Sequence, residues 1–237
     1  MTPTIADLFA TVDAPWPAAA LHPAGPWLVR EGRGGGKRVS AAAAGRPVAV
    51  ADLAAMEAAQ AALHQSPLVM IRQGEDALDA LLAAQGYRIV DPVVIYLAPT
   101  TKLTGALPHL AAFPVWPPLA IQAEVWAAGH IGPERMAVMN RVAGSKTSIF
   151  ARTNDRAAGA AFVGVAGDIA MLHALEVSHA MRRQGSAANM MRAAANWAQT
   201  QGAGWFSLVV TETNAPARAL YASLGMSVVG QYHYRMK

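Results

Sequence analysis

The segment 175–187 contains the residues whose types and spacing point most directly to chemistry. It follows an apolar run, carries the adjacent arginines Arg182 and Arg183, and leads through Gly185 into a helix-forming stretch. A glycine followed by two small residues leaves the first N–H groups of a helix accessible, and these groups attract phosphate together with the helix dipole. The two guanidinium groups add positive charge beside them. The segment therefore predicts a site for an anion such as a phosphate group at the start of a helix.

Two blocks of the sequence resemble the signatures of a known family. Residues 175–187, with the pattern Arg-x-x-Gly-x-Ala at 182–187, resemble the pyrophosphate-binding motif of the GNAT superfamily, the acyl-CoA-dependent N-acetyltransferases. Residues 214–226 resemble its second signature, in which Asn precedes a helix that ends Leu-Tyr-x-x-x-Gly-Met. The two blocks stand in the family's order, and the resemblance extends over residues 119–237.

The resemblance implies acetyl-CoA as cosubstrate and assigns roles to individual residues. Backbone groups of Leu175 and Val177 would bind the pantetheine arm and polarise the thioester carbonyl. Asn214 would hydrogen-bond the pantetheine region, and the hydroxyl of Tyr221 would protonate the departing CoA thiolate as a general acid. The residues implied to hold the pyrophosphate are Arg182, Arg183, Gly185, Ser186 and Ala187.

The general base is left open by the sequence. Many family members carry a Glu on the strand before the phosphate loop, at the position of Met171 here. His173 lies on the same face of that strand, and its ordinary pKa near 6.5 suits the deprotonation of an amine. A strand histidine held in place by hydrogen bonds is an equal alternative, and so is a proton path through water. Glu176 faces the other side of the strand, and His179 is expected in solvent.

Hydrophobic periodicity and turn residues predict the elements that must position these residues. The fold class expected is α/β (α+β), a GNAT-like mixed, mostly antiparallel sheet flanked by helices. The strands expected in the second half are 119–126, 147–152, 157–165, 169–177, 205–211 and 226–235. The helices expected there are 133–142, 186–201 and 215–224.

The first half is expected to be a smaller, related copy. An offset of 139 residues aligns 68–71 with 207–210 without a gap, and the same order of strand, helix and strand follows in both places. The identical residues are Leu81 and Leu220, Ala83 and Ala222, Gly86 and Gly225, and Val90 and Val229. The elements expected in the first copy are the strand 67–72, the helix 76–85 and the strand 87–97.

The first copy lacks the residues that acyl-CoA binding needs. At the same offset, Leu82 stands in place of Tyr221, and Glu75 stands in place of Asn214. Pro47 falls within the counterpart of the phosphate loop, where it removes an N–H donor. One active site per chain is therefore expected.

The chain is expected to divide into a degenerate N-terminal domain (1–98), a linker (99–118) and a catalytic domain (119–237). The linker contains five of the 15 prolines and is predicted to form neither helix nor central strand. Strands are expected at 27–31 and 37–42, around a glycine-rich turn. That turn is not a phosphate-binding P-loop, because no Ser or Thr follows its Gly-Lys pair.

Composition excludes several classes of protein. The 237 residues include no cysteine, which excludes disulfides, thiol catalysis and zinc ribbons. No run of about 18 apolar residues is present, and no signal peptide is apparent, so no membrane association and a cytoplasmic location are expected. The net charge is only +4 with scattered basic residues, so no nucleic-acid partner is expected, and no metal site is predicted.

The predicted function is transfer of an acetyl or other acyl group from acetyl-CoA to a primary amine by direct attack. The acceptor is a small-molecule or peptide amine whose identity the sequence leaves open, as it leaves open the oligomeric state. Glu124 and Glu134 could attract a cationic amine or could simply be solvated. The alternative is a non-catalytic acyl-CoA-binding or regulatory protein of the same fold. A nucleic-acid-binding module, the third hypothesis, predicts a DNA affinity that falls steeply with salt.

Overall fold

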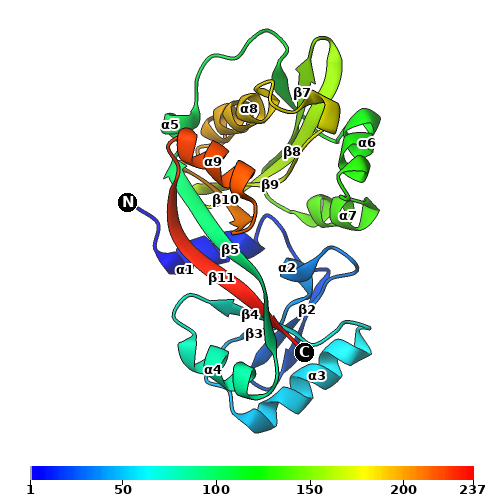
Figure 1. The fold of residues 1–237 in the computed structure, drawn as a ribbon, viewed down its shortest axis with the longest axis vertical. Coiled ribbons are helices and arrows are strands. Elements are labelled where there is room, and N and C mark those ends of the chain that lie inside the picture. The colour runs from blue at the N-terminus through cyan, green and yellow to red at the C-terminus, as the bar shows by residue number, and fades with distance from the viewer. Residues whose placement is uncertain (1) are drawn as a thin grey trace.

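In the computed structural model, which describes residues 2–237, one eight-stranded sheet runs through both halves of the chain (Figure 1). In spatial order its strands are β4 (Leu68–Arg72), β11 (Ser227–Met236), β5 (Arg88–Pro99), β10 (Trp205–Thr211), β9 (Ile169–Val177), β8 (Arg156–Ala166), β7 (Lys146–Thr153) and β6 (Ala112–Val115). Neighbouring strands are antiparallel except β9 and β10, which are parallel. The mixed, mostly antiparallel α/β fold is thereby confirmed.

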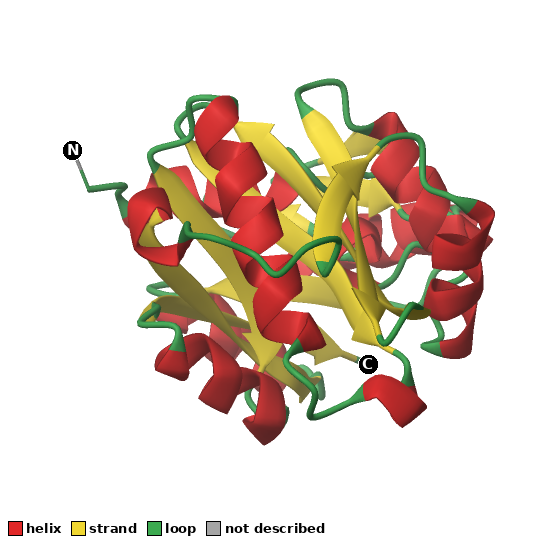
Figure 2. Ribbon diagram, turned by 90° about the horizontal axis from the view of Figure 1, so that it is seen from above, coloured by secondary structure: helices red, strands yellow, loops and turns green. Residues whose placement is uncertain are grey.

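Helices cover both faces of this sheet (Figure 2). The helix α8 (Ser186–Thr200) packs its buried Met190, Ala194 and Ala198 on one face, against β6 to β9. The helices α6 (Ala120–Ala128) and α7 (Pro133–Arg141) cover the other face, where Trp126 and Val138 belong to one buried hydrophobic cluster with Phe162 of β8. The alternation of side chains along a strand explains how β8 serves both layers.

The first half adds a three-stranded sheet and several short helices. The strands are β1 (Ala20–Ala24), β2 (Trp27–Glu31) and β3 (Ala43–Ala44). The remaining α-helices are α1 (Ile5–Asp13), α2 (Lys37–Ser40), α3 (Leu53–Ala62), α4 (Asp76–Ala84), α5 (Thr100–Leu103) and α9 (Ala215–Ser223). Single 3-10 turns are formed by η1 (Val50–Asp52) and η2 (His179–Met181). In residues 2–237 no helix combines the length and the apolar character that crossing a membrane requires.

The two halves exchange their last strands. The order β4, α4, β5 in the first half is repeated as β10, α9, β11 in the second, and α4 shifted by 139 residues has the bounds of α9. β5 lies beside β10, however, and β11 lies beside β4, so each half completes the other (Figure 1).

The registers of the exchanged strands obey the same offset. The pair Thr211↔Val93 between β10 and β5 becomes Arg72↔Tyr232 between β4 and β11 when 139 is added or subtracted. The pair Val93↔Tyr232 between β5 and β11 maps onto itself, which places it on a pseudo-twofold axis. Positions 93–98 of β5 are all buried, as expected for a strand in the middle of a sheet.

Three expectations about secondary structure were wrong. Residues 119–126, expected as a strand, belong to α6, because Gln122, Val125 and Trp126 form a buried face at helical spacing and the Gln122 side chain accepts a hydrogen bond from the Leu119 N–H (2.9 Å). Residues 37–42, also expected as a strand, begin with the helical turn α2. The proline-rich segment 99–118 contains the four-residue helix α5, contrary to expectation, whereas its strand β6 lies at the edge of the sheet, where proline is tolerated, and so is not a central strand.

An ionic cluster joins the first half to β11 of the second. Asp79 of α4 accepts hydrogen bonds from Arg235 Nε (2.7 Å) and Nη2 (2.9 Å), and its Oδ1 lies 2.7 Å from His233 Nε2. The guanidinium of Arg235 is the main reason that the pKa of Asp79 falls to about 2. A carboxyl group with a depressed pKa stabilises the fold above its unfolded-state pKa and loses that contribution as the pH falls.

Asp79→Asn is expected to lower the free energy of unfolding by about 2 kcal/mol at pH 7, the order of magnitude that the pKa shift implies. Between pH 4 and pH 2 the difference between the variant and the wild type should shrink, because the Asp79 carboxyl group of the unfolded chain, with its ordinary pKa of 3.8, binds a proton there, whereas the folded one, with a pKa of about 2, resists it. Urea unfolding at pH 7, 4 and 3 measures both effects. Asp76→Asn, an exposed change on the same helix, is the control. An Asp79→Asn effect that is equal at all three pH values would contradict this account.

Candidate active site

The site begins where the parallel strands β9 and β10 diverge. They pair from Ile169↔Trp205 to Leu172↔Leu208, and the pairing stops there although both strands continue. The far end of β9, residues 173–177, therefore presents an edge that β10 does not cover. Such an edge can accept an extended ligand as an added strand.

A bulge shapes this edge of β9. His173 pairs with Phe162 of β8 and Glu176 pairs with Ala160, so β9 has one residue more than β8 between the two pairs. Ala174 lies within the bulge at a φ of 50°, a strained conformation for a residue with a Cβ. The indole N–H of Trp126 donates a hydrogen bond to its carbonyl (2.8 Å) and holds it in place. The bulge re-aims the backbone of the next residues, including the predicted Leu175 and Val177.

The predicted phosphate loop leads from this edge into α8. Gly185 is the N-cap of the helix at a φ of +83°, and a Cβ placed there would meet no atom within 4 Å. The space above the helix start is therefore open. Ser186 is buried and its hydroxyl lies 2.8 Å from that of Thr153, so only its backbone and that of Ala187 remain for an anion. The start of α8 has no side-chain cap among the described residues.

The two arginines of the loop lie differently. Arg182 turns back along β9, where its Nε donates to the carbonyl of Val177 (3.2 Å) and its Nη2 donates to Glu176 Oε1 (3.2 Å). Arg183 is exposed and has a left-handed backbone. Arg182 therefore lies at the edge of β9 that is predicted to bind the pantetheine arm.

On the second signature, Asn214 and Tyr221 occupy different positions on α9. The side-chain oxygen of Asn214 accepts a hydrogen bond from Ala217 N (3.2 Å) and so caps the helix. Tyr221 is buried, and its ring lies edge-on to that of Tyr96, with 5.6 Å between centroids. Burial, with a smaller contribution from the Tyr96 phenol, raises the pKa of Tyr221 to about 12. Tyr221 therefore carries its proton at neutral pH and can donate it.

Tyr96 is a neighbour that sequence reasoning missed. It belongs to β5 of the first half and reaches Tyr221 because that strand is exchanged into the position beside β10. The repeat alone indicated the strand but gave no signal of the exchange.

His173, the predicted base, is buried on the opposite face of the sheet from α8. Its Nδ1 accepts a hydrogen bond from Arg38 Nη1 (2.9 Å), and its ring lies 4.9 Å from that of Trp16. Burial first, and then the nearby positive charge of Arg38, lowers the pKa of His173 well below its usual value. A neutral imidazole whose Nδ1 accepts a hydrogen bond carries its proton on Nε2. The geometry therefore makes His173 a poor proton acceptor.

A pocket of about 330 Å³ opens between the diverging strands on the side of His173. Ala174 of β9 and residues 209–211 of β10 form one wall, and the segment 35–38 from the first half forms another. The other lining residues are Trp16, Asp91, Val93, Arg135, His173, Tyr232 and Tyr234. The first half therefore builds part of a pocket that the second half opens. The described residues include no cluster of His, Cys, Asp and Glu suited to a metal ion.

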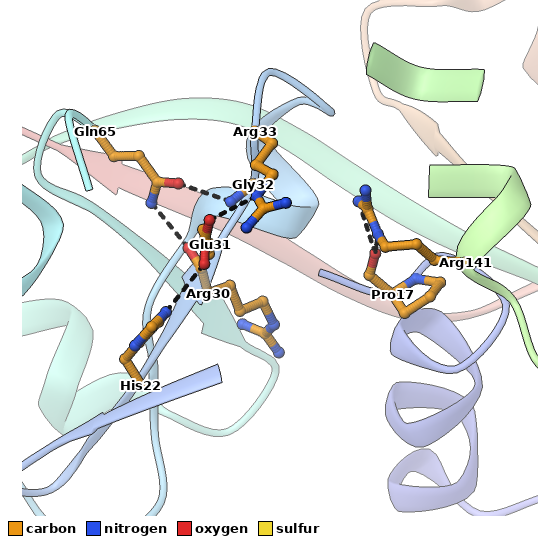
Figure 3. Close-up of polar contacts among 8 residues, drawn as sticks. All are labelled: Pro17, His22, Arg30, Glu31, Gly32, Arg33, Gln65 and Arg141. Atoms are coloured by element: carbon orange, nitrogen blue, oxygen red, sulfur yellow. Dashed lines mark hydrogen bonds and ion pairs between the residues drawn. The ribbon is translucent and has the colours of Figure 1, made fainter. Parts of the chain in front are cut away.

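Polar contacts fix the glycine-rich turn that carries the segment 35–38 (Figure 3). The Gly32 N–H donates to Gln65 Oε1 (2.7 Å), and Gln65 Nε2 donates to the carbonyl of Arg30 (2.8 Å). At the same place Glu31 pairs with Arg33 (2.6 Å). The end of β2 is thereby held in a defined direction before the turn begins.

The turn is packed closely against α7. A Cβ at Gly35 would lie 2.6 Å from a methyl group of Val138, so a larger residue has no room there. Gly36 has a φ of +100° and caps α2, which carries Arg38 towards His173. Glycine is thus required by contact and by conformation, and the expectation of a structural turn without a phosphate-loop motif is retained.

Comparison with known proteins extends these observations. Residues 119–226 match the model of the Acetyltransferase (GNAT) family. No curated protein matches the chain. Among solved structures, a GCN5-related N-acetyltransferase from Kribbella flavida is similar to it at a TM-score of 0.70 and 19% identity, covering 93% of this chain and 90% of that one.

Two further structures show how widely the fold is shared. A functionally unknown conserved protein from Staphylococcus epidermidis matches at a TM-score of 0.70 and 9% identity, over 97% of this chain and 96% of that one. A tandem GNAT protein from the clavulanic acid biosynthesis pathway matches at 0.63 and 14% identity, over 83% and 74%. At such identities these likenesses concern the fold, and they include the first half. By its two signatures, its sheet and its family match, the chain contains a domain of the acetyltransferase (GNAT) family at residues 119–226.

Proposed function

We propose that the protein transfers an acetyl group from acetyl-CoA to a primary amine of an acceptor by direct attack in a ternary complex. One observation carries the proposal: the uncovered edge of β9 lies between an open helix start at Gly185 and a pocket on the other face of the sheet. A thioester placed in the opening could then be reached by an acceptor from the opposite side.

The edge and the loop would hold acetyl-CoA as a substrate. Backbone groups of Leu175 and Val177 would bind the pantetheine arm, with Asn214 hydrogen-bonding the same region. The pyrophosphate would lie at the start of α8, where accessible N–H groups and the helix dipole favour negative charge. When acetyl-CoA binds, Arg182 would give up its hydrogen bond to the Val177 carbonyl and bind the substrate instead. The groups proposed for the pyrophosphate are those of Arg182, Arg183, Gly185, Ser186 and Ala187.

The reaction needs two charges to be compensated. The amine nitrogen attacks the thioester carbonyl carbon, and N–H groups near the β9 bulge stabilise the resulting oxyanion. Collapse of this intermediate breaks the carbon–sulfur bond, and the Tyr221 hydroxyl gives its proton to the leaving thiolate. Because the Nδ1 of His173 is already occupied by Arg38, we assign the amine's proton to water in the pocket, and His173 to positioning Arg38.

The first half is proposed to be a degenerate copy that shapes the pocket and binds no acyl-CoA of its own. Apart from the short helix α2 between β2 and β3, its elements β1, β2, β3, α3, β4, α4 and β5 follow the order of β7, β8, β9, α8, β10, α9 and β11. The counterpart of β9, however, has only two residues, and Pro47 lies in the loop that follows it. The fold likeness to a tandem GNAT protein supports this proposal.

The alternative, a non-catalytic acyl-CoA-binding or regulatory protein, is favoured by one specific observation. Met171 is buried at the position where many family members carry a glutamate, and the nearby His173 has a depressed pKa. The two functions share the acetyl-CoA site and differ in turnover.

A paired measurement separates the two functions. Titration calorimetry of the full chain with acetyl-CoA measures binding, and release of the CoA thiol in the presence of a panel of primary amines measures turnover. We expect binding together with amine-dependent thiol release. Binding without turnover on any amine would support the regulatory alternative, and no binding would overturn both.

A further inference from the structure

The pocket between the diverging strands carries an excess of positive charge. Three cationic side chains line it, those of Lys37, Arg38 and Arg135, against the single carboxylate of Asp91. Lys37 and Asp91 form an ion pair with each other (2.8 Å). Arg38 and Arg135 form no ion pair with any residue in the range 2–237. Two guanidinium groups therefore face a concave site without a counter-ion from the protein.

Contacts within the described chain satisfy only part of the hydrogen-bonding capacity of Arg38. Its Nη1 donates to the neutral His173 (2.9 Å), and its guanidinium carbon lies 5.7 Å from the centroid of the Trp16 ring. Its Nε is buried and lacks a hydrogen-bond partner within the described chain, and so does Nε2 of His173. A buried donor without an acceptor costs free energy, and retaining it usually indicates a missing partner.

Arg135 approaches the same place from another element. It is exposed on α7, and its Nε and Nη2 lie 3.7 Å from the position that a Cβ of Gly36 would occupy. The glycine turn thus brings a cation of the first half and a cation of the second half to one pocket. A pair of guanidinium groups is well suited to an oxyanion, because each offers several N–H donors in a plane.

We propose that this pocket binds a small oxyanion carried by the acceptor, so that the substrate is an amine that also bears an acid group. The inference rests on the proposed function, since it names the substrate class of the same site. Ala174 of the bulge lines the pocket, so the anion would lie close to the opening where the thioester is proposed to sit. The amine and the acid group are therefore separated by few bonds. Glu124 and Glu134 do not line the pocket, which leaves the attraction of a purely cationic amine without support there.

The same charges would assist the chemistry. A positive charge near an ammonium group lowers the pKa of that group, because like charges disfavour the protonated form. An acceptor anchored by its acid group beside Arg38 and Arg135 would therefore present a larger fraction of neutral, nucleophilic amine. This effect reduces the need for a dedicated base at a site where Met171 and an occupied His173 supply none.

The test compares amines that carry an acid group, here called the acids, with amines of equal length that carry none, here called the neutral amines. β-Alanine, taurine and O-phosphoethanolamine place a carboxylate, a sulfonate and a phosphate two carbons from the amine, and propylamine and ethanolamine are their neutral counterparts. Glycine and 4-aminobutyrate, each with the neutral amine of the same length, extend the series. CoA release by the full chain is expected to show at least tenfold higher kcat/KM for one of the acids, chiefly through KM. The best acid identifies the oxyanion, and equal or better use of the neutral amines would overturn the inference.

Variants locate the effect. Arg38→Met should remove the preference for the acid while changing the KM for acetyl-CoA less than twofold, and Arg38→Lys should retain part of it. Arg46→Met, which removes an exposed arginine outside the pocket, is the matched control and should behave as the wild type. A preference that survives in both Arg38→Met and Arg135→Met would contradict the proposed site, and so would a loss of acetyl-CoA affinity equal to the loss for the acid.

Binding separates failure of this inference from failure of the proposed function. If no amine is acetylated, the function fails, and calorimetry with N-acetyl-β-alanine, N-acetyltaurine and the neutral N-propylacetamide still tests the anion site. Binding of an acidic compound at least tenfold tighter than the neutral one, lost in Arg38→Met, would support the site. Equal or undetectable binding of all three would overturn it.

Discussion

Gly185→Glu is expected to weaken acetyl-CoA binding at least a hundredfold, or about 2.7 kcal/mol. The backbone φ of +83° already strains any residue other than glycine, and the space above Gly185 is open. A glutamate side chain would fill that space and place a negative charge where the pyrophosphate is proposed to lie. Calorimetry measures the affinity, and circular dichroism shows that the fold is retained.

Gly202→Glu is the matched control for this variant. Gly202 lies just beyond the other end of α8, with the same φ of +83° and the same absence of atoms around a Cβ. The control therefore imposes the same backbone strain on the same helix. Its carboxylate lies near the C-terminal end, where the helix dipole disfavours negative charge. Equal acetyl-CoA affinity in Gly185→Glu and the wild type would refute the assigned phosphate site. Equal losses in both variants would show that strain alone is responsible.

Tyr221→Phe is expected to lower kcat by a factor on the order of 10² to 10³ while the KM for acetyl-CoA changes less than about twofold. The substitution removes the proposed proton donor and keeps the ring against Tyr96. Because the pKa of Tyr221 is raised to about 12, the wild-type phenol stays protonated through pH 10. The wild-type pH–rate profile should therefore show no loss of activity below pH 10 that depends on Tyr221.

Tyr87→Phe tests whether any buried tyrosine has the same effect. Tyr87 is buried in the first half, its hydroxyl donates to Glu57 (2.6 Å), and neither residue lines the pocket between the diverging strands. Its loss should lower stability and leave kcat near the wild-type value. If Tyr221→Phe turns over as fast as the wild type, Tyr221 has a packing role only.

The parts of the site that are local in sequence could be predicted from it. Gly185 at a helix start and Asn214 just before a helix follow from rules that act over three or four residues. The bounds of α4, α9 and β10 were likewise close to expectation, because their apolar periodicity is regular. The segment 119–126 was predicted wrongly because its alternation of apolar and polar residues is compatible with a strand, whereas the helix is favoured by the buried face of Gln122, Val125 and Trp126 and by the hydrogen bond between the ends of its first turn.

The parts that arise between the halves could not be predicted. The repeat at an offset of 139 residues indicated two similar units, yet nothing in either unit specifies that β5 and β11 change places. Tyr96 beside Tyr221 depends on this exchange. Arg38 is 135 residues away from His173 in the sequence, and it reaches the histidine because the glycine-rich turn before it packs against α7. Long-range contacts of this kind are set by tertiary packing and leave no local pattern.

The central claim is that acetyl-CoA binds in the opening between β9 and β10, and a crystal structure of the protein soaked with acetyl-CoA tests it most directly. We expect the pantetheine arm along Leu175 and Val177, the pyrophosphate at the start of α8 above Gly185, and the sulfur within hydrogen-bond reach of the Tyr221 hydroxyl. Acetyl-CoA bound elsewhere, or with its thioester turned away from Tyr221, would contradict it.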